Sequence, residues 1–342
     1  MSGGSLVQRV RIRGFGPLGA LEFAPSSVCA LVGDAAAGKS TLLEAVAAAL
    51  SGDGAGVEAN YRHGLPQHIF FRAAARTHDV GPLRSPGGAA LGLVADLEDR
   101  TAAGGGTVFL IEEPELYLKP QTQRYLYRLL HRLAAAGNQV IYSTHAPALL
   151  SVTRLEELAF VRRLPDGRTE IHQPGPLPWQ DAAFELANDF DAERAELFLS
   201  RGALLVEGRT EKLVFPFVFR SLGHDVDADG LTIVDCGGKS RIAPFAQVCE
   251  LCRIPFVAVH DRDSRRGGRP PIPAERALND LIARTVPHDR LVVLEPDLEG
   301  ASGLSAHRHK PEHAWEHFVG LEATQMPEPL TRAADRLLAV SR

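Results

Sequence analysis

A glycine-rich stretch near the N-terminus carries the residue types that bind a triphosphate. Residues 33–41 read G-D-A-A-A-G-K-S-T, between an apolar run typical of a strand and one typical of a helix. In that setting successive backbone N–H groups can converge on phosphate oxygens. Lysine can then reach the β- and γ-phosphates, and serine can ligate Mg²⁺. We predict that a nucleoside triphosphate is bound by Gly33, Gly38, Lys39, Ser40 and Thr41; a plain connecting turn is the weaker interpretation.

Two adjacent carboxylates follow the apolar run at 107–111, which is typical of a buried parallel strand. Carboxylates at the end of such a strand are costly unless they serve a cation. We predict that Glu112 contributes to the Mg²⁺ shell and that Glu113 orients or deprotonates the attacking water. The alternative is an acidic cap for the helix after Pro114, which does not explain two acids before the proline.

A histidine follows the next apolar strand pattern, at 139–143. At the tip of a core strand beside a nucleotide, His145 can contact the γ-phosphate and report its presence. A lone histidine is more often a solvated or packing residue. Its position downstream of the two preceding motifs favours the functional interpretation.

Five further carboxylates follow strand patterns in the second half of the chain. The carboxyl ends of strands in open α/β sheets are where ligands bind. Carboxylates that converge there repel one another unless hard divalent cations hold them. Two such cations about 3.5–4 Å apart are the usual arrangement for phosphodiester cleavage. We predict a site for two Mg²⁺ or Mn²⁺ ions, against the alternative of ordinary solvated loop acids, at Glu207, Glu211, Asp261, Asp263 and Glu299.

Basic residues cluster beside these acids, in runs at 262–269 and 307–310. Either run could be a solvated loop. Next to a metal site, both could instead hold a DNA backbone. Lys310 could also stabilise charge on the scissile phosphate.

The composition limits the class of protein. The chain has 342 residues, enough for two domains, and is 45% hydrophobic and 23% charged, as globular proteins are. Its net charge of −5 means that any nucleic-acid surface must be local. Four cysteines fit a reducing cytosol, and we expect the pair at Cys249 and Cys252 to pack inside a helix. Because no apolar run approaches the ~20 residues of a membrane span, we expect a cytoplasmic protein without membrane contact.

Alternating strand and helix patterns predict an α/β fold with parallel sheets that position these residues. A hairpin is expected over 6–23, and another over 158–173. We expect further strands at 28–32, 107–111, 139–143, 203–206, 231–234, 255–259 and 290–294. Helices are expected at 39–50, 88–100, 120–136 and 274–286, and after the strands ending at 206 and 234. The predicted domains are 1–195 and 196–315, followed by a C-terminal helical tail at 316–342.

The first half resembles the ABC-type ATPases of the chromosome-maintenance and recombination class. The resemblance rests on residues 33–41 (Walker A), 109–115 (F-L-I-E-E-P-E, Walker B) and 143–145 (S-T-H, switch histidine). The second half resembles a Toprim domain, a Rossmann-like parallel-sheet fold, at 204–212 (L-L-V-E-G-R-T-E-K) and 261–263 (D-R-D). This order of domains is similar to the overcoming-lysogenization-defect (OLD) nucleases, over nearly the whole chain.

The resemblance implies an ATPase coupled to a metal-dependent DNA endonuclease that dimerises through its ATPase half. It implies ATP and Mg²⁺ at the P-loop and places Lys310 near the scissile phosphate. The chain departs from the ABC pattern in several places. The dimer signature is reduced to 84–88 (R-S-P-G-G), the interval before Walker B is short, and Gln67 is a weak candidate for the glutamine loop. Tyr117 and Lys119 replace histidines often seen after the Walker B acids.

The function predicted from these features is an ATP-binding and ATP-hydrolysing endonuclease that uses two metal ions at the Toprim site. Two alternatives remain open at this point. The chain could be a non-catalytic, ATP-switched scaffold that binds DNA or a protein. It could also be a Toprim nuclease that acts on RNA.

Overall fold

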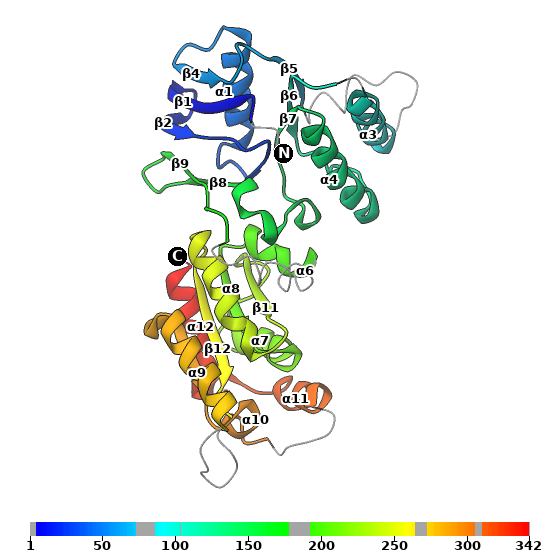
Figure 1. The fold of residues 1–342 in the computed structure, drawn as a ribbon. Helices are drawn as coiled ribbons and strands as arrows, with labels where there is room; N and C mark the ends of the chain where they lie inside the picture. Colours follow the sequence, from blue (N-terminus) through cyan, green and yellow to red (C-terminus); the bar gives the residue numbers. More distant parts are fainter. Residues whose placement is uncertain are drawn as a thin grey trace. The chain divides into compact units, whose positions relative to one another are not determined.

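The chain forms two compact units, Met1–Trp179 and Gln180–Arg342, each with its own sheet and core. The computed structural model in Figure 1 describes residues 5–72, 86–102, 104–177, 192–263, 272–304 and 310–341. The units divide after Trp179, before the boundary near Glu196 that the sequence predicted. Within the described residues no helix is long and apolar enough to cross a membrane.

The first unit is built on a six-stranded sheet that is parallel except at its last strand. Every residue of its two central strands is buried, as their continuous apolar sequences predict. The strand order is β5 (Gln67–Phe71), β6 (Thr107–Glu112), β7 (Gln139–Ser143), β3 (Val28–Val32), β8 (Leu158–Arg163) and β9 (Thr169–His172). The expected hairpins at 6–23 and 158–173 are confirmed as antiparallel pairs.

A smaller antiparallel sheet and several helices, among them α1, α3 and α4, accompany the large sheet in the described part of this unit (Figure 1). The small sheet has the order β2 (Leu18–Phe23), β1 (Val7–Phe15) and β4 (Val57–Tyr61). Helix α1 (Lys39–Ser51) contacts both sheets and buries Leu42, Leu43 and Val46 in their common core. Helices α3 (Pro86–Ala102) and α4 (Pro120–Ala135) contact each other. Strands β4 and β5 lie in a region whose mixed sequence predicted no element.

The second unit has a four-stranded parallel sheet with helices on both faces. Its strand order is β11 (Leu231–Asp235), β10 (Gly202–Val206), β12 (Phe256–Asp261) and β13 (Leu291–Leu294). Alternate residues of each strand face opposite sides of the sheet. One face packs against α7 (Arg209–Ser221) and α12 (Glu328–Val340). Helix α8 (Lys239–Leu251) contacts β10, β12 and α9 (Pro273–Thr285). The predicted α/β fold is confirmed in both units.

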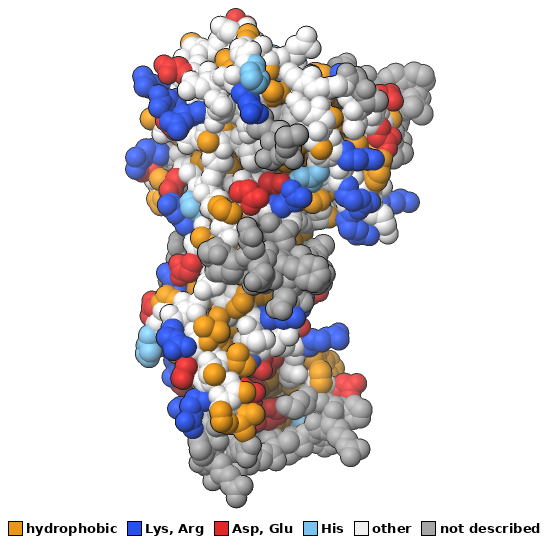
Figure 2. Space-filling view, in the orientation of Figure 1, with side chains coloured by type: hydrophobic (Ala, Val, Ile, Leu, Met, Phe, Trp, Pro, Cys, Tyr) orange, Lys and Arg blue, Asp and Glu red, His pale blue; other side chains and the backbone are white. Residues whose placement is uncertain are grey.

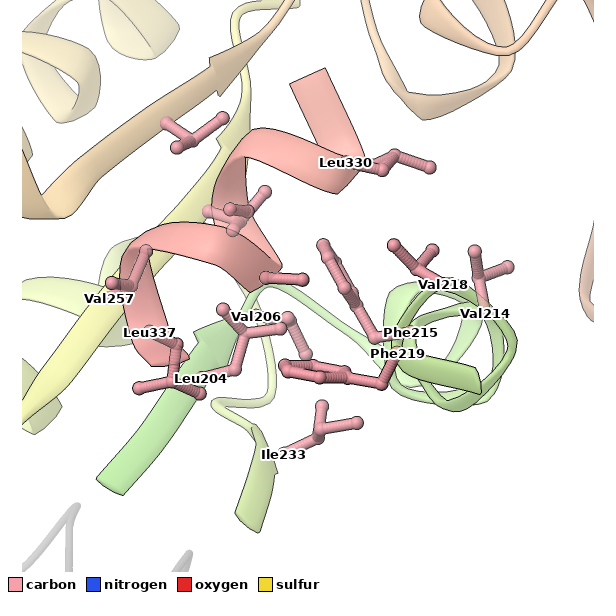
Figure 3. Packing of buried hydrophobic residues seen from close by; sticks show 14 of the residues in the cluster. Leu204, Val206, Val214, Phe215, Val218, Phe219, Ile233, Val257, Leu330 and Leu337 are labelled. Atoms are coloured by element: carbon pink, nitrogen blue, oxygen red, sulfur yellow. The ribbon is translucent and has the colours of Figure 1, made fainter. Parts of the chain in front are cut away.

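The C-terminal helix α12 lies in the predicted helical tail at 316–342 and belongs to the core of the second unit. Its apolar residues recur at helical spacing and form one face. Figure 3 shows Leu330 and Leu337 packed with Leu204, Val257 and Phe215.

All four cysteines are buried and free, so the predicted packing role of Cys249 and Cys252 is confirmed. Figure 2 shows hydrophobic side chains at the surface of the second unit, with Lys and Arg side chains on either side.

Candidate functional site

The phosphate-binding loop connects β3 to α1, as its sequence predicts. Gly33 approaches the neighbouring strand so closely that a Cβ would lie 2.0 Å from the carbonyl oxygen of Val161. Gly38 caps α1 with a φ of 108°, a conformation that favours glycine. Both glycines are therefore required by the backbone path. Ser40 is exposed and Thr41 half-buried at the start of α1, where backbone N–H groups are available to an anion.

Lys39 is folded over the loop that it follows. Its Nζ donates hydrogen bonds to the carbonyl oxygens of Gly33 (2.6 Å) and Asp34 (2.8 Å). Burial lowers the pKa of Lys39, while the negative charges of Glu113 and Asp34 oppose this effect. The ammonium group thus lies at the mouth of the loop, where it can exchange carbonyl contacts for phosphate contacts.

Sheet order brings the next two predicted residues beside this loop. Strands β6, β7 and β3 are parallel neighbours, so their carboxyl ends share one edge. Glu113 has a φ of 43°, and its backbone N–H points to Ser143, 3.1 Å from the carbonyl oxygen and 3.2 Å from Oγ. Nε2 of His145 lies 3.9 Å from Oε1 of Glu113. Burial, and then the charge of Lys39, lowers the pKa of His145, which favours a neutral imidazole.

Glu115 is a residue of this site that we did not predict. It is only 9% exposed and accepts hydrogen bonds from Thr144 Oγ1 (2.9 Å) and from the backbone N–H of His145 (2.7 Å). Burial raises the pKa of Glu115, and these hydrogen bonds oppose that shift. The third acid of the E-E-P-E sequence therefore fixes the backbone that carries His145.

Replacing Glu115 with alanine is expected to destabilise the first unit by about 2 kcal/mol, because two donors lose their acceptor in a buried place. Urea unfolding monitored by circular dichroism measures this change. Glu58→Ala, at an exposed carboxylate of the same unit, is the control and should change the unfolding free energy by less than about 0.5 kcal/mol. Equal stability of the two variants would contradict the role given to Glu115.

The second site lies where β10 and β12 end beside each other. Glu207 follows β10, and one of its oxygens lies 3.4 Å from the backbone nitrogen of Asp261 at the end of β12. Glu211, buried in the first turn of α7, accepts a hydrogen bond from the N–H of Gly208 (3.1 Å). Oδ1 of Asp261 accepts one from the N–H of Leu298 (2.9 Å), next to the buried Glu299 in α10 (Leu298–Ala301).

Burial and the neighbouring carboxylates raise the pKa values of two acids in this cluster. Burial raises the pKa of Glu207 to about 7, although the charge of Lys239 opposes the shift. Burial also raises the pKa of Asp261 to about 8, and the charges of Glu211 and Glu207 raise it further. In the described part of the chain, no three acidic, histidine or cysteine side chains form a ready-made ion cage. The carboxylates would turn from their present donors to a divalent cation, which would relieve their mutual repulsion.

Lys239 is a second residue that we did not assign to a site. It is 5% exposed, and Nζ pairs with Asp263 and with Oε2 of Glu275 (3.2 Å). Burial alone would lower the pKa of Lys239, but the hydrogen bond and charge of Asp263 outweigh it and raise the pKa. In the sequence, this lysine follows two glycines. In the structure both glycines have positive φ and turn the chain from β11 into α8.

Several of the predicted residues lie wholly or partly outside the described part of the chain. Most of the two basic runs lies outside the described residues, as do Arg84 and Ser85 of the reduced dimer signature. Lys310 begins α11 (Lys310–Phe318), but its side chain is not described. Arg262 is described and pairs with the exposed Glu295 at 3.3 Å. The glutamine-loop candidate was wrong, because Gln67 pairs with Thr107 at the edge of the sheet opposite Glu112.

Models of known protein families match parts of both units. Residues 198–263 match the model of the overcoming lysogenization defect protein-like TOPRIM domain. Residues 89–151 match an AAA domain model described as putative AbiEii toxin, type IV TA system. An OLD nuclease of Thermus scotoductus is 36% identical over 255 residues, 69% of this chain. These matches support an OLD-family arrangement of an ATPase unit and a Toprim unit.

Other proteins match this chain with lower sequence identity and over a smaller part of it. The Old nuclease of Escherichia phage P2 is 28% identical over 176 residues, 48% of this chain. The chain spans about half of the Thermus relative (48%) and 29% of the phage relative. The C-terminal region of the Burkholderia pseudomallei OLD protein is 18% identical, covering 42% of this chain and all of that one, with a TM-score of 0.35. The SMC head domain of Thermotoga maritima is 16% identical, covering 51% and 99%, with a TM-score of 0.34.

Proposed function

We propose that this protein is an ATP-binding and ATP-hydrolysing endonuclease that cleaves DNA at its Toprim carboxylates with divalent cations. The observation that carries the proposal is the convergence of acids that follow β10, begin α7 and end β12 at one edge of the second sheet. The named nuclease activity of the Thermus relative supports it. An intact P-loop in the same chain supports coupling to ATP.

The carboxylates fit Mg²⁺ or Mn²⁺, because the ligands are oxygens and their repulsion favours a cation. When bound, two such ions would stabilise the attacking and leaving oxygens of the phosphodiester. The ligands would be Glu207, Glu211, Asp261, Asp263 and Glu299, and Lys239 holds Asp263 beside them. Lys310, at the start of α11, is proposed to stabilise charge on the scissile phosphate.

At the nucleotide, each side chain has a separate task. Lys39 binds the β- and γ-phosphates, and Ser40 and Glu112 belong to the Mg²⁺ shell. Glu113 orients or deprotonates water, and the neutral His145 beside it contacts the γ-phosphate. A homodimer formed through the ATPase unit would complete the nucleotide site, as the resemblance to ABC-type ATPases implies.

A plasmid assay tests this proposal. Pure protein incubated with supercoiled plasmid and Mn²⁺ is expected to produce nicked and linear DNA, and EDTA should stop the reaction. Agarose gels measure the products, and a parallel incubation with tRNA tests the RNA alternative. Metal-dependent cleavage of tRNA alone would make the protein an RNA nuclease. No cleavage of either substrate would favour the ATP-switched scaffold.

A further inference from the structure

The second unit contains a cleft of about 710 Å³ outside the carboxylate site. It lies along the exposed side of α7, between α6 (Ala192–Ala195), the end of β11 and the start of α11. Figure 1 shows α7 beside β11, and α7 also contacts α11. The opposite side of α7 is buried in the core through Val214, Phe215 and Phe219. The helix thus presents a rigid, supported wall to the cleft.

The described lining of this cleft is basic, although the chain has a net charge of −5. Arg194, Arg209, Lys212 and Arg220 line it together with two acids. Lys212 pairs with Glu193, and Nε of Arg194 donates a hydrogen bond to the carbonyl oxygen of Asp235 (2.6 Å). Arg209 and Arg220 are exposed, so their guanidinium groups are accessible to an anionic ligand.

Apolar side chains lie between these cations. Leu213 lines the cleft and is 37% exposed. Phe217 lines the cleft one turn further along α7, and the guanidinium carbon of Arg220 lies 5.8 Å from its ring centre. The cleft therefore alternates positive and apolar contacts along one helix face. This mixture suits a ligand that carries both negative charges and flat apolar surfaces.

The cleft starts at the edge of the sheet that carries the carboxylates. Arg209 is the second residue after Glu207, at the first position of α7. Asp235, also in the lining, pairs in the sheet with Val206, the residue before Glu207. A chain lying along α7 would consequently reach the carboxylate cluster at the start of the helix.

We propose that this cleft binds an unpaired polynucleotide strand and leads it to the Toprim carboxylates. The inference rests on the proposed nuclease function and adds the form of its substrate. Phosphates would contact Arg209 and Arg220, while bases would lie against Leu213 and Phe217. Only an unpaired strand exposes base faces to such contacts, because a duplex buries them in its stack. An acidic peptide could match the charges, but the continuity with the carboxylates favours a phosphodiester chain.

Binding without catalysis tests the proposal. Fluorescein-labelled dT12 and rU12 are titrated with the full chain in EDTA, and anisotropy gives Kd between 50 and 200 mM salt. Wild type is expected to bind at least one strand. Arg209→Gln combined with Arg220→Gln should weaken binding roughly tenfold and reduce the salt slope by about 1.4, since each single-strand phosphate contact contributes about 0.7. Arg284→Gln with Arg332→Gln, two exposed arginines on α9 and α12, is the charge-matched control and should bind as wild type does.

Three results would overturn the proposal: no strand binding by wild type, equal binding by the cleft variant and the control, or tighter binding of a matching 12-base-pair duplex. The relative affinities of dT12 and rU12 identify whether the strand is DNA or RNA, and either strand supports the cleft. These outcomes are separate from the proposed function. If plasmid is cleaved and the cleft variant still binds wild-type amounts of strand, the nuclease stands and the cleft does not.

Discussion

Replacing Glu207 with glutamine is expected to abolish metal-dependent plasmid nicking while leaving ATP turnover largely intact. Glutamine keeps the size of the side chain but removes the negative charge from a half-buried position between β10 and Asp261. Changes to residues that only support a metal ligand cost about 10–100-fold, so removing a ligand charge should reduce nicking by at least about 100-fold. Gel assays of nicking and phosphate-release assays of ATP hydrolysis measure the two activities.

Metal binding gives a readout of this substitution that does not depend on activity. Isothermal titration with Mn²⁺ should show weaker binding by Glu207→Gln than by wild type. Glu316→Gln, at an exposed carboxylate of the same unit, is the matched control and should behave as wild type in every assay. Nicking by Glu207→Gln at the wild-type rate would contradict the proposal that the carboxylates of the second unit carry out cleavage.

Lys39→Ala is expected to weaken ATP binding by about 3 kcal/mol, roughly 100-fold, because charge-assisted hydrogen bonds to phosphates are lost. Its ammonium lies at the loop mouth, bonded to the carbonyl oxygens of Gly33 and Asp34. Fluorescent ATP analogues measure the affinity. Lys119→Ala removes an exposed lysine from the same unit and is the control.

The same variant tests coupling between the two units. If ATP gates cleavage, Lys39→Ala should change the response of nicking to ATP without changing Mn²⁺ binding at the carboxylates. Identical cleavage by wild type and variant, with and without ATP, would mean that the nucleotide controls another step. ATP affinity equal to that of wild type would contradict the role of Lys39 itself.

The glycine-rich loop at 33–41 was predictable because short-range geometry dictates it. Residues 33–41 need glycine where the backbone turns towards β8, and the structure places Gly33 against the carbonyl of Val161. The continuous apolar strands predicted a parallel sheet, and the structure shows that their shared edge brings Glu113 and His145 together. Glu115 was missed because its partners, Thr144 and the His145 backbone, come from another strand.

At the carboxylate site, too, contacts between residues distant in sequence were not predicted. The types and order of the acids predicted a cation site, but not the buried Lys239, whose partners come from the end of β12 and from α9. Gln67 failed for a related reason, because only the pairing of β5 with β6 shows which edge of the sheet it occupies. Similarly, the apolar face of α12 was visible in the sequence, but its place beneath the second sheet was not.

The sequence by itself determined the glycine-rich loop, the acids that follow strands, and the alternation of strands and helices. It also determined the order of the two domains, because all of these depend on local spacing and periodicity. Tertiary structure alone decided which side chains meet: Glu115 with His145, Lys239 with Asp263, and the basic and apolar lining of the α7 cleft. The physical reason is that turn geometry and the periodicity of strands and helices depend on residues within one short segment. Burial, charge pairing and cleft shape arise from residues that are distant in sequence.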